Sequence, residues 1–307
     1  MLRRAGLACL LVVLTACAPQ PKPSEAPSHE QHAAPDATPS ATTPALRASS
    51  SATEATAPSP PKVSVFFVGN AHVDEADLRA VMKATDPASV AINGLDVLLE
   101  RDVLYISSLY MDRGFIDVTV DAPNILPEER GETQVRVTIH EGIAYKLGKV
   151  DLVERDDQDK EITPLETKKA LLARLTIKSP EVFSRTKFGE FARQIHDLYS
   201  DAGYAAVEVL PSLEQKRKSA TVDVEVLIRR HQIWYFDTVN VVGNVNVPAA
   251  TILGSITVVP GNRFSLSAIE ESKRRLEATG QFSRVDVAME RGARPNLMKL
   301  NIEVTER

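Results

Sequence analysis

A strand-turn-helix pattern recurs along this chain, and the repetition constrains the fold more tightly than any other feature. The stretches VSVFFVGNAHVDEADL, from Val63, and VNVVGNVNVPAATIL, from Val239, each combine an alternating apolar strand, a Gly-Asn pair and the start of a helix. The midpoint between the two Gly-Asn pairs falls on Asp156-Asp157, which also separates an apolar strand from a helical pattern. Three evenly spaced copies indicate a tandem repeat of one structural unit.

A second landmark follows each copy in the same order. It is a glycine and an aromatic residue, with valines three and five positions after the aromatic: Gly114, Phe115, Val118 and Val120; Gly203, Tyr204, Val207 and Val209; Gly280, Phe282, Val285 and Val287. The glycine suits the end of a helix, where a left-handed residue closes the last turn. The alternate valines predict a strand that buries one face.

Each unit therefore follows the order β-α-α-β-β over about 80 residues, which predicts an α+β chain of three tandem repeats. The last two strands are expected to form an antiparallel hairpin, and the first strand joins the same sheet through a helical crossover. Two helices then cover one face of each small, three-stranded mixed sheet. The expected first helices and second-helix caps are Asp74–Ala84, Pro164–Leu175 and Pro248–Ile256, with Asn93, Ser184 and Ser265 as caps.

This arrangement resembles the POTRA (polypeptide-transport-associated) domain family. The resemblance rests on the β-α-α-β-β order, the Gly-Asn after the first strand, and Gly-aromatic-x-x-Val-x-Val after the second helix. It covers about residues 62 to 307 and implies repeats at 62–141, 142–229 and 230–307. It is most similar to the periplasmic part of outer-membrane assembly proteins of the BamA and TamA type. In those proteins POTRA arrays precede a membrane β-barrel, which is not expected in this sequence.

The first 17 residues have the form of a lipoprotein signal peptide. Arg3 and Arg4 precede an apolar run that is too short to span a bilayer. The ending Leu14-Thr15-Ala16-Cys17 resembles a lipobox, which implies that Cys17 carries a lipid; an ordinary signal peptide cut nearby is the alternative. Residues 18–61 are rich in Pro, Ala, Ser and Thr and predict a disordered tether.

An edge strand with unpaired N–H and C=O groups can bind an extended polypeptide by β-augmentation. The resemblance implies that this edge is the second strand of each repeat. The candidate residues are Ile116, Asp117, Val118, Thr119 and Val120; Ala205, Ala206, Val207, Glu208 and Val209; and Ser283, Arg284, Val285, Asp286 and Val287. The alternative is that these edges are only solvated, blunted by Asp117, Glu208 and Asp286.

Signals for catalysis and for other ligands are weak. The histidines show no metal-ligand spacing such as H-E-x-x-H, and G-x-S-x-G is absent from the sequence. The sequence therefore predicts a protein that is not an enzyme and that uses no metal or other cofactor. A net charge of −5 argues against a nucleic-acid partner, because nucleic-acid-binding proteins carry a basic surplus.

Together these features predict a lipid-anchored polypeptide-binding scaffold of outer-membrane protein assembly, located at the outer membrane and facing the periplasm of a Gram-negative bacterium. The expected partners are an outer-membrane β-barrel or assembly complex, unfolded outer-membrane protein clients, and the membrane itself through the lipid. The alternatives are a structural adaptor in secretion or cell-envelope assembly, a truncated protein of the BamA and TamA type, or an exported enzyme.

Overall fold

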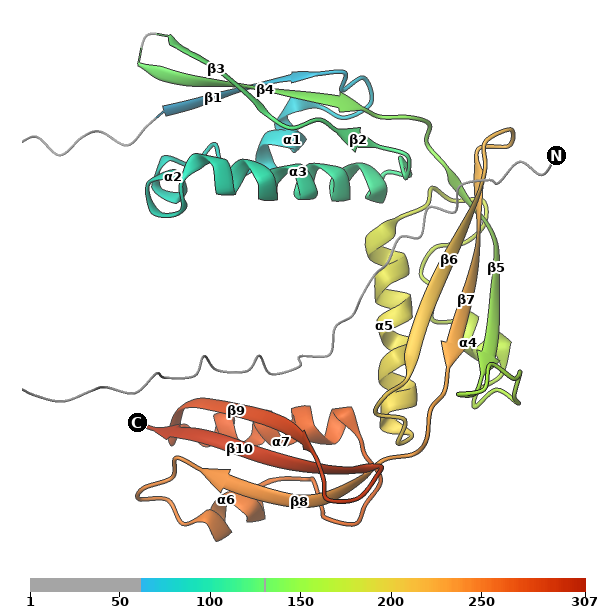
Figure 1. Ribbon diagram of the computed structural model, residues 1–307, viewed down its shortest axis with the longest axis vertical. Coiled ribbons are helices and arrows are strands. Elements are labelled where there is room, and N and C mark those ends of the chain that lie inside the picture. Colours follow the sequence, from blue (N-terminus) through green and yellow to red (C-terminus); the bar gives the residue numbers. More distant parts are fainter. Residues whose placement is uncertain (1–61, 130) are drawn as a thin grey trace, which may run out of the picture. The chain divides into compact units, whose positions relative to one another are not determined.

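The computed structural model describes residues 62–129 and 131–307. The predicted signal peptide, the proposed lipid site Cys17 and the tether 18–61 lie outside the described residues. Within the described part the three repeats each form a separate sheet, and each sheet has helices on one face (Figure 1). The predicted α+β class is confirmed, and the second and third repeats have the predicted β-α-α-β-β order.

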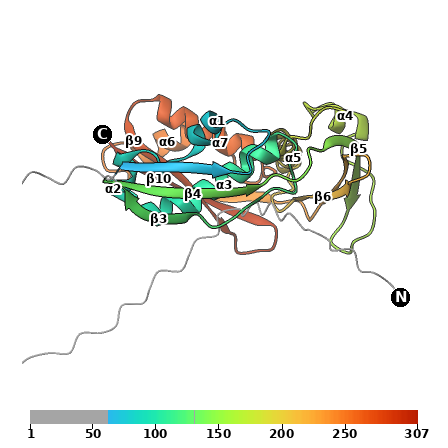
Figure 2. The same cartoon turned by 90° about the horizontal axis from the view of Figure 1, so that it is seen from above.

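The first repeat has one helix and one strand more than the predicted order. Its elements are β1 (Lys62–Val68), α1 (Glu75–Val81), α2 (Pro87–Asn93), α3 (Leu95–Asp112), β2 (Thr119–Val120), β3 (Asn124–Glu129) and β4 (Glu132–His140). Strand β4 is central, parallel to β1 on one side and antiparallel to β2 and β3 on the other. Figure 2 shows β1, β4 and β3 side by side.

The second and third repeats keep the five-element order. Their elements are β5 (Lys146–Arg155), α4 (Lys168–Leu172), α5 (Arg185–Asp201), β6 (Glu208–Lys216) and β7 (Thr221–Arg229), then β8 (Tyr235–Val242), α6 (Ala249–Ser255), α7 (Leu266–Ala278), β9 (Phe282–Arg291) and β10 (Leu297–Glu306). In both sheets the last strand is central: β7 lies between β5 and β6, and β10 lies between β8 and β9. The first strand is parallel to the central one, and the hairpin partner is antiparallel.

Helix starts follow local capping chemistry in the second and third repeats. The Ser184 hydroxyl accepts a hydrogen bond from Lys187 N (3.2 Å), and the Ser265 hydroxyl accepts one from Ala268 N (3.1 Å), so both predicted caps are confirmed. The prediction for Asn93 is wrong, because that residue ends α2 and Gly94 precedes α3. Pro164 does not start a helix either, since Thr167 caps α4.

Each repeat has its own apolar core between sheet and helices. In α5, Phe188, Phe191, Ile195 and Tyr199 are buried at spacings of three and four, and they pack on inward valines of β7. Among the described residues, no helix combines the length and the hydrophobicity that crossing a bilayer requires.

Candidate functional site

Every sheet has two edges, because the central strand is the last one of the repeat. In the second and third repeats the second strand forms one edge, as predicted, and in the first repeat β2 and β3 share that edge. The first strand forms the other edge of each sheet. Sequence reasoning named only the second-strand edge. The first-strand edge also follows from the predicted topology. In a three-stranded sheet with the last strand at the centre, the first strand has no further strand to pair with on its outer side.

In the first repeat the candidate edge is mostly not a strand. Only Thr119 and Val120 form β2, and Ile116–Val118 lie in the turn that follows α3. Asp117 is engaged by the second repeat, since its Oδ2 accepts hydrogen bonds from the Tyr145 hydroxyl (2.8 Å) and from Arg217 Nη2 (3.0 Å). The prediction of a strand over Ile116–Val120 is therefore wrong for its first three residues. They form a turn that contacts the second repeat, and only two residues are left in the strand.

In the second repeat the strand begins three residues later than predicted. Ala205, Ala206 and Val207 precede β6, and Val207 and Val209 are buried in the core. From Glu208 the edge strand pairs with β7 along its whole length. Pro211 lies in this strand and has no N–H to offer a partner, which weakens β6 as a template for pairing.

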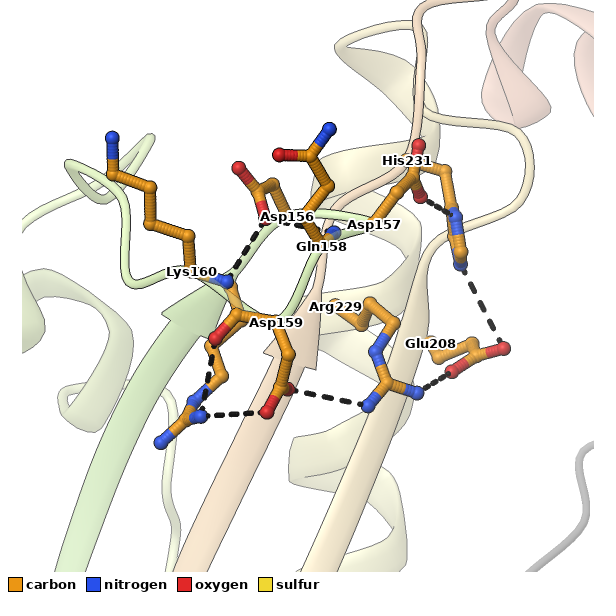
Figure 3. A network of polar contacts seen from close by, with 9 residues as sticks. Asp156, Asp157, Gln158, Asp159, Lys160, Glu208, Arg229 and His231 are labelled. Carbon is orange, nitrogen blue, oxygen red and sulfur yellow. Dashed lines mark hydrogen bonds and ion pairs between the residues drawn. The ribbon is translucent and has the colours of Figure 1, made fainter.

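Charged groups also occupy the start of β6 (Figure 3). Glu208 Oε2 is 3.0 Å from Arg229 Nη1, and Glu208 Oε1 is 3.7 Å from His231 Nε2. His231 in turn pairs with Asp157, and Arg229 reaches Asp159 at 3.6 Å. The network ties the turn after β5, where the other repeats have Gly-Asn, to the end of β7 and to the edge strand.

In the third repeat the candidate residues Ser283–Val287 all lie within β9, a ten-residue strand without proline. The hairpin register shows which backbone groups face outward. Gly292 N donates to Leu297 O (2.8 Å), on the side of β10 that pairs with β9. Directly opposed residues of an antiparallel pair alternate between hydrogen-bonded and non-hydrogen-bonded. With Arg291 opposite Met298, the N–H and C=O groups of Val285, Val287 and Met289 therefore point away from the sheet.

The side chains on β9 are suited to an accessible edge. Val285 is buried in the core, and Met289 is 44% exposed. Asp286 pairs with Arg284 on the same strand and lies 3.9 Å from Lys273 of α7. Charge on the edge is thus balanced locally, and the outward backbone groups of β9 have no further backbone partner among the described residues.

The first-strand edges differ between repeats. The segment before α5 covers the start of β5, with Leu147 N donating to Glu181 O at 2.8 Å, and the segment before α7 covers β8, with Phe236 N donating to Asn262 O at 2.9 Å. Within the described residues β1 has no such backbone cover, and only the Arg79 side chain reaches its outer side, at Val65 O (2.6 Å).

Ionisable groups do not converge on a catalytic or metal-binding arrangement in the described residues. No group of three or more His, Cys, Asp or Glu side chains is placed to hold a metal ion within residues 62–129 and 131–307. One buried polar contact of the first repeat joins the Tyr110 hydroxyl to Glu141 Oε1 (2.9 Å). Burial and that bond raise the pKa of Tyr110, which keeps the phenol protonated.

Comparison with known proteins places these features in a family. The profile of the POTRA family, described as "Surface antigen variable number repeat", matches residues 62–142, 164–230 and 235–307. The outer membrane protein assembly factor BamA of Nitratidesulfovibrio vulgaris is 28% identical over 215 residues, which are 69% of this chain and 26% of that protein. BamA of Neisseria meningitidis serogroup B is 24% identical over 213 residues, 67% of this chain and 25% of that protein.

Among solved structures, the crystal structure of Haemophilus influenzae BamA POTRA3-5 superposes with a TM-score of 0.65. It covers 80% of this chain and 96% of that chain at 16% identity, which establishes a common fold. The chain spans about a quarter of the length of the two BamA relatives.

Proposed function

The chain belongs to the POTRA family, and from that membership we propose that it is a non-enzymatic, polypeptide-binding scaffold in outer-membrane protein assembly. Two relatives, matched over 69% and 67% of this chain, are named as outer membrane protein assembly factors. The repeats, taken as 62–141, 142–229 and 230–307, would receive extended segments of unfolded clients or of a partner barrel. The signal sequence and Cys17 would hold the array at the periplasmic side of the outer membrane.

The observation that carries this proposal is the open edge of β9. Three alternate residues, Val285, Val287 and Met289, turn their backbone groups away from the sheet, and the strand contains no proline. An incoming strand would pair with these groups and extend the sheet. Recognition through the backbone depends little on client sequence, which suits a scaffold that serves many β-rich clients. The other two second-strand edges are shorter or carry a proline, so β9 is the binding edge we propose.

The test is a pair of substitutions at Met289. Met289→Pro removes the outward N–H while leaving the bonds to β10 in place, and proline is tolerated at such edge positions. Met289→Ala shortens the same exposed side chain and keeps the N–H. Binding of a urea-unfolded outer-membrane β-barrel precursor to the full chain is measured after dilution from urea, and circular dichroism verifies folding.

We expect Met289→Pro to weaken precursor binding by about tenfold, the value of a backbone hydrogen bond lost at a desolvated contact. Met289→Ala should bind like the natural chain. Bound precursor should also slow hydrogen exchange at Val285, Val287 and Met289. Equal binding by both variants, with no slowed exchange on β9, would refute the edge. Loss of binding in both would instead indicate recognition of the side chain.

The anchor has an independent test. Palmitate fed to cells should label the natural chain and not the Cys17→Ala variant. Persistent labelling of that variant would overturn the lipid site and would leave the β9 proposal intact.

A further inference from the structure

The first strand of the first repeat, β1, has a composition that favours pairing with other strands. From Val63 to Val68 it reads VSVFFV and contains neither a charged residue nor a proline. Short segments of β-branched and aromatic residues with little charge pair readily with one another. Because β1 lies at an edge of its sheet, such a segment invites association between chains unless something blocks it.

The outward backbone groups of β1 belong to alternate residues. Val65 O is one of them, because it accepts its hydrogen bond from the helix α1 and not from β4. Successive residues of a strand turn their backbone groups to opposite sides, so Val63 and Phe67 also turn theirs away from β4. Phe66 and Val68 are 47% and 48% exposed. A strand added to β1 would therefore find outward backbone groups and apolar side chains to pack on.

The first strands of the other two repeats are protected in ways that β1 is not. The segments before α5 and α7 cover the starts of β5 and β8 through backbone hydrogen bonds. Both strands also carry charge within their length, for example Asp151 in β5 and Asp237 in β8. Within the described residues, β1 has no such backbone cover, and it has no charge after Lys62.

Arg79 of α1 occupies the edge of β1 instead. Its Nη2 donates to Val65 O at 2.6 Å, in the middle of the outward backbone groups. The same nitrogen donates to Glu75 Oε2 at 3.1 Å, and the guanidinium carbon lies 5.3 Å from the centre of the Phe67 ring. These contacts hold a positive charge against the strand. A strand could pair at Val65 only by displacing the guanidinium or by burying it, and burying a charge is costly.

The other repeats show that the fold does not require an arginine at this position. Counted from the turn after the first strand, the residue equivalent to Arg79 is Glu166 in the second repeat and Leu253 in the third. The arginine thus occurs in the repeat whose first strand lacks both a charge of its own and a backbone cover. This coincidence ties the arginine to the edge and not to the core.

We propose that Arg79 is an edge guard, a side chain that keeps β1 from pairing with β1 of a second copy of this chain. Two copies would pair as antiparallel strands about Val65, because this register sets outward groups against outward groups. Val63 would then lie opposite Phe67, and no charge between these residues opposes the pairing. The two guanidinium groups oppose it, because both would lie beside the twofold axis at Val65.

Arg79→Met tests the guard in the full-length chain, purified in detergent. Methionine keeps a long, unbranched side chain and a good helix propensity, and it removes the guanidinium. In this variant, hydrogen exchange at the amides of Val63, Val65 and Phe67 should slow by about tenfold as the protein concentration is raised, because only unpaired copies exchange. The natural chain should exchange fast at these amides at every concentration.

Two further variants separate the guard from a general effect of losing an arginine. Arg113→Met is the matched control, because Arg113 is also a surface arginine paired with one carboxylate, Asp77 at 2.5 Å, and is 36% exposed against 41% for Arg79. It should exchange like the natural chain. Phe66→Lys added to Arg79→Met places a charge on the unguarded strand and should restore fast exchange. Circular dichroism verifies that each variant is folded.

Three results would overturn the proposal. The first is exchange at Val63, Val65 and Phe67 that stays fast at every concentration in folded Arg79→Met. The second is a natural chain in which the same amides already slow with concentration. The third is slowing that persists when Phe66→Lys is added. The guard does not depend on polypeptide binding at β9, so Met289→Pro should change none of these outcomes.

Discussion

Gly69 and Gly243 occupy the same place in the first and third repeats, directly after the first strand. Both have positive φ, 91° and 85°. A Cβ atom at Gly69 would lie 2.1 Å from Ile139 O, and one at Gly243 would lie 2.3 Å from Val304 O. The glycine is required because the turn passes over the backbone of the central strand. The Gly-Asn pair is therefore a packing feature of the fold and not a ligand loop.

We expect Gly243→Ala to destabilise the third repeat more than Gly280→Ala does. Both positions have positive φ, which costs an L-residue about 1–2 kcal/mol, but a Cβ at Gly280 meets nothing within 4 Å. The close approach should add at least about 1 kcal/mol at Gly243. Urea unfolding of both variants measures the difference. Equal losses would mean that backbone conformation alone selects glycine at Gly243.

Glu306 holds the turn that follows Gly243. Its carboxylate accepts hydrogen bonds from Val247 N (2.9 Å), Val245 N (2.8 Å) and Asn246 N (3.0 Å). These bonds lower the pKa of Glu306 from 4.5 to about 2. Glu141 plays a similar part in the first repeat, where it accepts a bond from His72 N (2.9 Å). The second repeat ends its central strand at Arg229 and has a different turn.

A lowered pKa fixes the sign of the pH dependence. The unfolded chain binds the proton more readily, so the contribution of Glu306 is full above about pH 4.5 and disappears as the pH falls through about 2. Amide exchange at Val245–Val247 should accelerate across that window beyond its intrinsic pH dependence. In Glu306→Gln these amides should show no such extra change. The same acceleration in Glu306→Gln would assign the effect to another carboxyl group.

At the scale of elements, each second helix helps to start the next one. Asp112, the last residue of α3, accepts a hydrogen bond from Thr186 N (2.6 Å) at the start of α5. Asp201, the last residue of α5, accepts a hydrogen bond from Ser267 N (2.8 Å) at the start of α7. Ser184 and Ser265 each accept a hydrogen bond from one further amide. The capping serine and the aspartate of the preceding long helix thus share the free N–H groups at the helix start. Ala278 takes the same position in α7 and has no carboxylate to offer.

Asp112→Ala should weaken the coupling between the first and second repeats by about 1–2 kcal/mol, the range for a lost helix cap. Asp112→Asn keeps an acceptor oxygen and should lose less. Hydrogen exchange at Thr186 in the two variants provides the measurement. An unchanged Thr186 amide in Asp112→Ala would show that water replaces the carboxylate without penalty.

At the scale of the whole molecule, the buried apolar residues form separate clusters, one each for the first and second repeats and two for the third. Stability in such an array is a sum of repeat stabilities and nearest-neighbour contacts. The backbone contacts at the junctions are alike, with Tyr145 N bonded to Gly114 O and Trp234 N bonded to Gly203 O, both at 2.8 Å. The repeats are thus linked by few contacts compared with those inside each core.

Core substitutions should therefore act locally. Ile106→Ala removes a fully buried side chain from the first repeat and should cost that repeat about 2–5 kcal/mol. Fluorescence of Trp234, the single tryptophan of the chain, should keep its midpoint in urea while far-ultraviolet circular dichroism gains an early transition. Ile302→Ala in the third repeat is the control and should move the tryptophan signal. Coincident shifts in Ile106→Ala would indicate one cooperative unit.

The sequence by itself determined the number of repeats, the element order and the caps Ser184 and Ser265. These features depend on local chemistry, because alternation, helical spacing and capping act over a few residues. The glycines at the ends of the second helices were also predicted from the sequence, since few residue types other than glycine adopt a positive φ. The extra helix α2 was missed, because Asn93 and Gly94 gave a helix start without showing that another helix ended there.

Only the tertiary structure decided which edges are open. Ile116–Val118 and Ala205–Val207 carry the same valine alternation as β9, yet they lie in turns near the junctions to the next repeat. Alternation of apolar residues shows which side of a segment is buried. It does not show whether the backbone pairs with a strand of its own repeat or forms a turn at the junction with the next repeat.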